Sequence, residues 1–402
     1  MKAWSARTLY RACLDLHWLV LRVLGLWRRG APTPTPGTKT ILLTGTFYSA
    51  NWILNHLEPL VASVNCSRVL LVSTFDLAPI PNVELISPPV WLVRSIGAVP
   101  ARLLYFTRTA IQRRPDFVGA FHLLPNGLLA VLVARLIGKK SIYFCGGGPR
   151  EVEGGGYYSG ARSFALLKAP DDGLERRLIR VVDQVDLIVT MGDRARAFFR
   201  DHGVRSRIEV VPGGVDADRF AAVEHAKSYD LILVGRLHPV KRIDLFLQVV
   251  ALLAKSKPDV SAVIVGGGNL EGSLRELAAR LNVAGRVTFA GSQRDVVPWL
   301  AQSKVFVLTS VSEGLSLALM EAMAAGLPAV VANVGELGEL VKHGASGFLV
   351  DDPSPQAYCT LIEQLLESGA LRAQMSAASR RTASGFTTRE AAKRWDRILV
   401  EA

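Results

Sequence analysis

Short, uninterrupted hydrophobic runs alternate with longer amphipathic stretches along the first half of the chain. Helical periodicity covers stretches such as 128–137 and 174–182, whereas the short runs are rich in β-branched residues and lack polar alternation. Strands of this kind are typical of a parallel sheet with helices on both faces. Residues 38–212 are therefore predicted to form one doubly wound, Rossmann-like α/β domain. Its expected strands are residues 39–45, 68–73, 116–122, 140–146, 185–192 and 207–214.

The same alternation begins again near residue 230, with helical periodicity over 243–255, 270–281 and 355–368. Two successive sheets of this size predict two Rossmann-like domains that face each other across a cleft. The second domain is expected over 213–380, and residues 381–402 are expected to end as a helix. Its expected strands are residues 230–236, 261–268, 286–291, 304–310, 328–332 and 347–350.

Residues 1–37 have a different pattern. At 100° per residue, charged side chains of the first 29 residues fall on one narrow stripe and apolar side chains on the opposite face. The charged stripe holds Arg7, Arg11, Asp15, Arg22 and Arg29, and the apolar face holds Leu9, Cys13, Leu16, Val20, Val23 and Trp27. Charges interrupt every apolar run, so neither a membrane span nor a signal peptide is expected. The pattern predicts an amphipathic helix on a membrane surface, followed by a stiff linker at 30–37. The alternative is a helix that packs on the protein's own body.

A second segment, 88–116, also mixes large apolar side chains with arginines. Trp91, Leu104 and Phe106 are among the former. The arginines are Arg94, Arg102, Arg108, Arg113 and Arg114. Arginines beside exposed aromatic residues suit the headgroup region of a bilayer. A core-facing helix with an ordinary solvated arginine face is the alternative for this segment.

The positive charge is confined to one half of the chain. The formal net charge is +12; residues 1–205 carry 26 Lys+Arg against 14 Asp+Glu, and the remainder carries 21 of each. Because the basic residues alternate with apolar runs and no nucleic-acid motif is present, an anionic lipid surface is expected as partner and nucleic acid is not. The four cysteines lack metal-ligand spacing, which favours a reducing cytoplasm.

Basic residues and glycines gather where the predicted strands of the second domain end, which is where ligands bind in such sheets. Arg236 and Lys241 follow the first strand. Gly266, Gly267 and Gly268 end the second and allow close approach of the backbone to a ligand. Their spacing does not match the full dinucleotide fingerprint, so a simple tight turn is the alternative.

Two glutamates stand in the almost wholly apolar stretch SEGLSLALMEAMAAGLPAV, residues 312–330. Glu313 is expected just outside a helix that begins near Leu315, and Glu321 lies roughly 12 Å along it. The free amides and dipole of such a helix end favour an anion. Carboxylates in an apolar setting need hydrogen-bond donors, which sugar hydroxyls supply in pairs. The alternative is two ordinary surface or ion-paired glutamates.

This stretch resembles the Glu-x7-Glu motif of the retaining nucleotide-sugar glycosyltransferases of family four, the group 1 type, which have the GT-B fold. The similarity continues through VVPGGVDADRF, LILVGRLHPVKRID, AVIVGGGNLEGSL and GELVKHGASGFLV, and it covers essentially all of 208–352. The resemblance implies an α/β enzyme of the GT-B class with a C-terminal helix that packs back on the first domain. It also implies a hexosyltransferase that takes a UDP- or GDP-sugar donor.

The resemblance also implies roles for individual residues. Glu321 would accept hydrogen bonds from the ribose hydroxyls and Glu313 from those of the donor sugar, while Arg236 and Lys241 would neutralise the leaving diphosphate. Backbone amides of Gly314, Leu315 and Ser316, with Gly266 and Gly267, would add to the donor site, and Phe289, Gly291 and Ser292 would seat the base. The resemblance further implies retention without a covalent enzyme intermediate, and neither a cofactor nor a metal is expected. Asp216 and Asp218 match a metal-binding DxD pattern of another fold but are expected in a structural turn.

The first domain departs from the family pattern. Cys145 and Gly146 stand where relatives have a His-Gly pair, so His122 is the candidate substitute near the reacting centre, with a structural histidine as the alternative. The acceptor side is expected to include Gly45, Thr46, Gly147, Arg150 and Tyr157.

Together these patterns predict a cytoplasmic enzyme, peripheral on the inner face of the cell membrane, that glycosylates a saccharide or lipid-linked acceptor in cell-surface polysaccharide or glycolipid biosynthesis. A GT-B epimerase or phosphorylase and a catalytically inactive scaffold are the alternatives. A nucleic-acid binder would show salt-sensitive binding to DNA or RNA.

Overall fold

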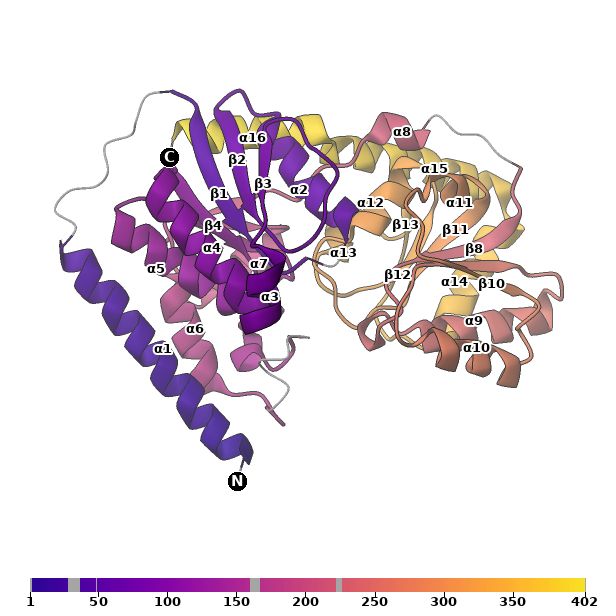
Figure 1. Ribbon diagram of the computed structural model, residues 1–402. Helices are drawn as coiled ribbons and strands as arrows, with labels where there is room; N and C mark the ends of the chain where they lie inside the picture. The colour runs from indigo at the N-terminus through magenta and orange to yellow at the C-terminus, as the bar shows by residue number, and fades with distance from the viewer. Residues whose placement is uncertain (1, 28–36, 48, 160–166, 222–225, 402) are drawn as a thin grey trace. The chain divides into compact units, whose positions relative to one another are not determined.

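The computed structural model describes residues 2–27, 37–47, 49–159, 167–221 and 226–401 (Figure 1). The chain divides into two compact units, residues 1–214 with 388–402 and residues 215–387. Each unit is built on one wholly parallel sheet with helices around it. The predicted pair of Rossmann-like domains is therefore confirmed. No helix among the described residues is long and apolar enough to cross a bilayer.

The first unit has a seven-stranded sheet in the order β3-β2-β1-β4-β5-β6-β7. The strands are β1 Lys39–Thr44, β2 Cys66–Val72, β3 Val83–Ile86, β4 Phe117–Phe121, β5 Lys140–Cys145, β6 Leu187–Thr190 and β7 Arg207–Val210. The order reverses between β1 and β4, so the carboxyl ends of these two strands mark the expected binding edge. The sequence pattern missed β3, an edge strand whose four residues are all half-buried.

Helices of the first unit cover both faces of this sheet. They are α1 Lys2–Trp27, α2 Ala50–Val61, α3 Val90–Ile96, α4 Ala98–Arg113, α5 Leu128–Ile137, α6 Asp172–Val182, α7 Asp193–Asp201 and α16 Thr388–Val400. On one face, α4 and α5 pack Phe106 and Val133 on the sheet. On the other, Trp395 of α16 is buried against Phe144 of β5. The C-terminal helix is thus part of the first unit.

The amphipathic helix predicted at the N-terminus is confirmed as α1. It lies along α5 and α6 (Figure 1), so it packs on the protein's own body. Arg7, Arg11 and Asp15 of its charged stripe contact α6 or its N-cap, whereas Arg22 is exposed and Arg29 lies outside the described residues. Arg11 and Asp15 both form ion pairs there.

The arginine-rich segment 88–116 forms α3 and α4, which are separated at Gly97, a glycine with φ of 89°. Trp91 and Leu104 are exposed. Arg102 is buried. Its guanidinium is satisfied there, because it donates to Thr46 Oγ1 at 3.0 Å and to Asn126 Oδ1 at 2.7 Å. The expectation that Arg102 faces lipid headgroups is therefore wrong; it supports the loops after β1 and β4 instead.

The second unit has a six-stranded sheet in the order β10-β9-β8-β11-β12-β13, which reverses between β8 and β11. The strands are β8 Tyr229–Val234, β9 Ala262–Val265, β10 Val287–Gly291, β11 Ser303–Leu308, β12 Ala329–Ala332 and β13 Gly347–Val350. The helices are α8 Ala217–Ala221, α9 Ile243–Ser256, α10 Glu271–Arg280, α11 Val297–Ala301, α12 Leu317–Ala324, α13 Leu337–Leu340, α14 Pro355–Glu367 and α15 Gly369–Ala383. Its main core packs Phe246, Leu253, Tyr358 and Ile362 against the sheet.

Candidate active site

The second unit gathers its charged candidates where β8 and β11 end. Lys241 Nζ lies 2.6 Å from Glu313 Oε1, and both side chains are largely buried. Ser310 Oγ donates to the same carboxylate oxygen. Because β8 and β11 are adjacent parallel strands, residues 72 positions apart meet at one edge of the sheet. Glu313 is therefore ion-paired, as the alternative interpretation of the two glutamates had it, although the sequence did not reveal Lys241 as its partner.

Backbone contacts hold this pair in place. Thr309 Oγ1 donates to the carbonyl oxygens of Lys241 and Arg242 at 2.9 and 2.8 Å. The amide of Val311 donates to Val240 O at 2.9 Å. The loop after β8 is therefore tied to the end of β11, and Lys241 has little freedom to leave Glu313 without rearrangement of these loops. Arg236, the other cationic candidate, is exposed at the end of β8.

A helix N-terminus completes this edge. Ser316 caps α12 by accepting a hydrogen bond from Leu319 N. Among the residues that the structure describes, none accepts a hydrogen bond from the amides of Gly314, Leu315 or Ser316. Three successive donors at the positive end of a helix dipole form a suitable place for phosphate oxygens.

Glu321 lies inside α12 and is only 8% exposed. In the described part of the chain no group donates a hydrogen bond to its carboxylate. Burial raises the pKa of Glu321 to about 7; nearby Arg219 acts in the opposite direction and Asp295 in the same one. A carboxyl group held in this state is suited to accept hydroxyl donors from a ligand.

The glycine-rich turn after β9 is shaped by the protein's own backbone. A Cβ at Gly266 would lie 1.9 Å from Gly235 O, and one at Gly268 would lie 2.5 Å from Leu237 O. At Gly267 it would meet Ser292 Oγ at 2.5 Å. Gly266 and Gly268 are therefore required for the loops after β8 and β9 to pack together, whereas at Gly267 the neighbouring atom is a serine hydroxyl that can rotate. Whether they also contact a ligand stays a prediction.

The residues expected to seat the base lie on β10 and just after it. The guanidinium of Arg275 lies over the ring of Phe289, 4.6 Å from its centroid. Gly291 has a φ of 68°, which lets the strand turn toward Ser292. The three candidates therefore follow one another at the same edge as Gly267, and their contact with a base stays a prediction.

The first unit has its own polar cluster, where β4 and β5 end. His122 Nδ1 lies 2.8 Å from Glu151 Oε1, and the imidazole stacks on Trp52 with an interplanar angle of 15°. The other carboxylate oxygen, Oε2, accepts from Leu123 N at 2.9 Å and from Tyr143 Oη at 2.7 Å. Since Glu151 holds Nδ1, contact with a substrate would fall to Nε2 of the ring.

Glu151 stays ionised although it is buried. Burial acts to raise its pKa, but the His122 side chain and the donors Tyr143 and Leu123 N hold the pKa of Glu151 below its ordinary value. The pKa of Tyr143 is raised well above its ordinary value, first by burial and then by Cys145 and Glu151. Tyr143 therefore remains a hydrogen-bond donor to the carboxylate. The sequence singled out His122 but not this network. Glu151, an acidic residue in the glycine-rich loop after β5, was the one available sign that His122 has a carboxylate partner.

The remaining acceptor-side candidates lie near the same edge. Gly147 N donates to Glu151 Oε1 at 3.2 Å, so it belongs to the His122 cluster. Thr46 follows β1 and Gly45, and it accepts from Arg102. Arg150 binds the carbonyl of Tyr158. Tyr157 is 36% exposed, and its ring meets that of Tyr158 edge to face. The structure therefore brings Gly147 and His122 into one cluster, while Arg150 supports the neighbouring loop.

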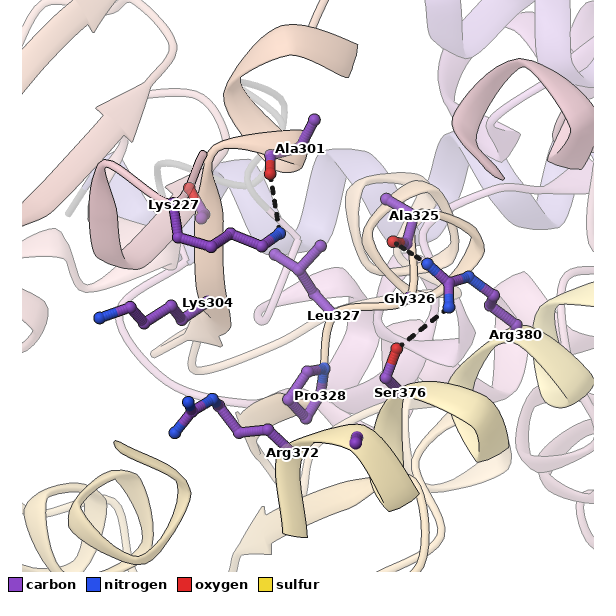
Figure 2. A pocket seen from close by; sticks show the side chains of 12 residues that line it. Lys227, Ala301, Lys304, Ala325, Gly326, Leu327, Pro328, Arg372, Ser376 and Arg380 are labelled. Atoms are coloured by element: carbon purple, nitrogen blue, oxygen red, sulfur yellow. Dashed lines mark hydrogen bonds between the residues drawn. The ribbon is translucent and has the colours of Figure 1, made fainter. Parts of the chain in front are cut away.

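A cavity of about 390 Å³ lies at the opposite edge of the second sheet, where β11 and β12 begin (Figure 2). Three of its basic side chains donate to carbonyls at helix C-termini, the groups that lack intrahelical partners. The pairs are Lys227 with Ala301 O, Arg372 with Leu366 O and Arg380 with Ala325 O. These residues thus cap helices, and the cavity is separate from the Lys241–Glu313 edge.

The DxD residues lie in a turn. Asp216 Oδ1 accepts a hydrogen bond from Arg219 N at the start of α8. Within the described ranges, no group of three or more potential ligands is arranged to hold a metal ion.

Two family profiles match this chain. The family described as "Glycosyl transferases group 1" matches residues 215–382, and "Glycosyltransferase Family 4" matches residues 66–219. Helix α1 lies outside both matched ranges.

Several curated relatives are named for one activity. A D-inositol 3-phosphate glycosyltransferase from Streptomyces avermitilis is 28% identical over 91% of this chain and 84% of its own length. One from Streptomyces scabiei is 31% identical over 53% of this chain, and the chain spans about half of that relative, 52%.

Solved structures share the fold. HepE from Anabaena, solved in complex with UDP-glucose, has a TM-score of 0.69 at 18% identity and covers 90% of this chain and 100% of its own. Sucrose-phosphate synthase from Thermosynechococcus elongatus has a TM-score of 0.71 at 16% identity, with 90% and 98% covered. At these identities the likeness concerns the fold alone.

Proposed function

Because the chain belongs to the group 1 glycosyltransferases of the GT-B fold, we propose that it transfers a hexose from a UDP- or GDP-sugar to an acceptor hydroxyl, with retention and without a metal ion. The observation that carries this proposal is the edge formed by β8, β11 and α12. It presents Lys241, Glu313 and Glu321 together with the amides of 314–316 at a helix N-terminus, for which the described part of the chain offers no acceptor.

The proposed chemistry is electrostatic. The leaving diphosphate gains negative charge as the glycosidic bond breaks, and Lys241, Arg236 and the amides of 314–316 would stabilise that charge. Glu313 orients Lys241 in the ligand-free protein and would accept hydroxyls of the donor sugar. Glu321 would accept the ribose hydroxyls. The remaining contribution is to hold donor and acceptor in a reactive orientation.

We assign the acceptor side to the first unit. His122, oriented by Glu151, would contact a hydroxyl near the reacting centre through Nε2. The name of these relatives suggests a phosphorylated polyol as acceptor. The basic first half of the chain and its apolar exposed segments favour a lipid-linked acceptor at the cytoplasmic membrane face, in cell-surface polysaccharide or glycolipid biosynthesis.

Nucleotide binding tests the donor assignment. UDP or GDP should raise the Tm of the wild type, and Glu321→Ala should abolish the shift. Glu276→Ala, which removes an exposed glutamate of the same unit, is the matched control. Unchanged nucleotide binding by Glu321→Ala would reject the ribose role.

Transfer assays test the acceptor and the stereochemistry. Labelled UDP- and GDP-hexoses are offered with inositol phosphate or with a polyprenyl-phosphate-linked sugar in detergent, with and without EDTA. Product from the lipid-linked acceptor alone, with the donor's anomeric configuration by NMR, is the expected result. Product from inositol phosphate alone would replace the lipid assignment. Free hexose released by water would indicate a hydrolysing epimerase, and hexose 1-phosphate formed with inorganic phosphate would indicate a phosphorylase.

A further inference from the structure

The solvent-facing side of α1 is almost entirely apolar. Leu9, Leu16 and Leu19 are 62%, 63% and 53% exposed. From Ala6 to Gly25 the exposed residues are Thr8, Leu9, Ala12, Cys13, Leu16, Leu19, Val20, Arg22 and Val23. Only one of these nine is charged. Their spacing of three and four residues places them on one continuous face of the helix, which we call the outer α1 face.

The inner side of α1 carries the charges. Arg11 Nη2 lies 2.7 Å from Asp171 Oδ1, and Asp15 Oδ2 lies 2.8 Å from Arg177 Nε. Asp171 is buried and also caps α6 by accepting from Leu174 N. Burial acts to raise its pKa, but Arg11 and Leu174 N hold the pKa of Asp171 below its ordinary value. The same inner side also packs Leu14 and Leu21 into the core of the unit, so α1 has apolar residues on two sides, and only the inner set is covered by the protein.

These contacts fix the orientation of α1. Leu14 and Leu21 are buried in the hydrophobic core of the unit, and the ring of Trp18 lies under the Arg180 guanidinium at 4.9 Å from its centroid. Rotation of the apolar face inward would break the buried ion pair of Asp171 and leave that carboxylate unpaired. The outer α1 face is therefore presented to a partner by the folded unit.

We propose that the outer α1 face docks into the headgroup–acyl boundary of an anionic lipid bilayer. The charges around the face select this partner. Four arginines and two aspartates line the α1–α6 contact, and the arginine side chains stay 28–45% exposed beside the face, while Arg22 lies on the face itself; the residues of the contact are Arg7, Arg11, Arg177, Arg180, Asp15 and Asp171. This positive excess attracts anionic headgroups.

The same charges argue against a second copy of the chain as the partner. A two-fold contact through the outer α1 face would bring the two arginine sets toward each other, and like charges at an interface are unfavourable. The inference rests on the proposed function for its purpose, because docking of α1 would hold the enzyme at the surface where a lipid-linked acceptor lies.

Vesicle flotation tests the surface. The full chain is mixed with vesicles of phosphatidylcholine alone or with 30% phosphatidylglycerol. We expect binding to the anionic vesicles and at least a tenfold loss of partitioning in the double variant Leu16→Ser, Leu19→Ser. The matched control is Val64→Ser, Val400→Ser, which changes two exposed apolar residues of the first unit outside α1, α3 and α4 and should leave binding like that of the wild type. Retained binding by the α1 variant, or loss in the control alone, would overturn the proposal.

The native cysteines allow a second measurement without a change in the outer α1 face. Cys13 is exposed on it, whereas Cys66, Cys145 and Cys359 are buried. An environment-sensitive fluorophore on Cys13 should shift to shorter wavelength with anionic vesicles, while the same label in Cys13→Ser, Glu276→Cys, on an exposed position of the second unit, should not. No shift at Cys13, or a shift caused by protein concentration without lipid, would overturn the proposal; the latter result would indicate a dimer.

Nucleotide binding separates this inference from the proposed function. UDP or GDP should stabilise Leu16→Ser, Leu19→Ser as they stabilise the wild type. Vesicle binding without any nucleotide binding would contradict the transferase proposal and leave the lipid surface standing. Nucleotide binding without vesicle binding would contradict the lipid surface and leave the transferase proposal standing.

Discussion

Replacement of Glu321 by glutamine should make the ligand-free protein more stable at pH 8 while it removes the donor site. Glu321 is 8% exposed, and burial raises its pKa from 4.5 to about 7. One pKa unit corresponds to about 1.4 kcal/mol, so the ionised carboxylate destabilises the folded state by about 3 kcal/mol. Glutamine has a similar shape and no charge to desolvate.

The sign of the pH dependence follows from the protons bound. Between about pH 4.5 and 7 the folded state keeps the Glu321 proton, whereas the unfolded chain has lost it. The free energy of unfolding of the wild type therefore falls as pH rises through this window and is constant above it, as far as this group is concerned. The advantage of Glu321→Gln should grow from near zero at pH 4 to about 3 kcal/mol at pH 8.

Domain-resolved unfolding measures this difference. Urea-dependent hydrogen exchange with mass spectrometry follows peptides of α12, with α5 of the first unit as internal reference and Glu276→Gln as matched control. The same measurement with UDP or GDP should show stabilisation of the wild type only, since a ligand that binds the folded state raises its stability. A difference between Glu321→Gln and wild type that does not change with pH, or a variant less stable at pH 8, would refute the reasoning.

Three further changes test other residues. Lys241→Ala should lower kcat more than tenfold, because the leaving diphosphate loses its buried cation; steady-state rates with saturating donor measure this, and a rate within twofold of wild type would reject the role. Glu151→Gln should lower kcat about tenfold with little change in KM, since His122 loses the carboxylate that orients it, and an unaltered pH profile of kcat would contradict this. Burial lowers the pKa of His56 to about 3, so the first unit should lose up to about 5 kcal/mol as pH falls from 6.5 toward 3; thermal unfolding of His56→Phe should show a weaker pH dependence, and an identical acid transition would exclude this histidine.

The strands were predictable because their signal is local. A run of β-branched residues buried on both faces is recognisable without its neighbours, and all strands of the second sheet lie within the predicted runs to a residue or two. The edge strand β3 lacked this signal, since Val83–Ile86 is only half-buried. The sequence placed Glu313 just before α12 and Glu321 within it for the same reason, because positions eight residues apart in the chain are related locally.

Partners across the fold were not predictable. Lys241 meets Glu313 only because β8 and β11 are adjacent in the sheet, and Glu151 reaches His122 only because β4 and β5 are. The periodicity of α1 showed that the helix has a charged side and an apolar side, but periodicity carries no information about which side faces the protein. Asp171 and Arg177, about 160 residues away, decide this, because a buried carboxylate needs a charged partner and α1 supplies it. The amino-acid sequence by itself determined two Rossmann-like domains, an amphipathic helix and a transferase motif; the tertiary structure decided which charges are paired and which apolar surface is left exposed, since both depend on contacts between residues far apart in the chain.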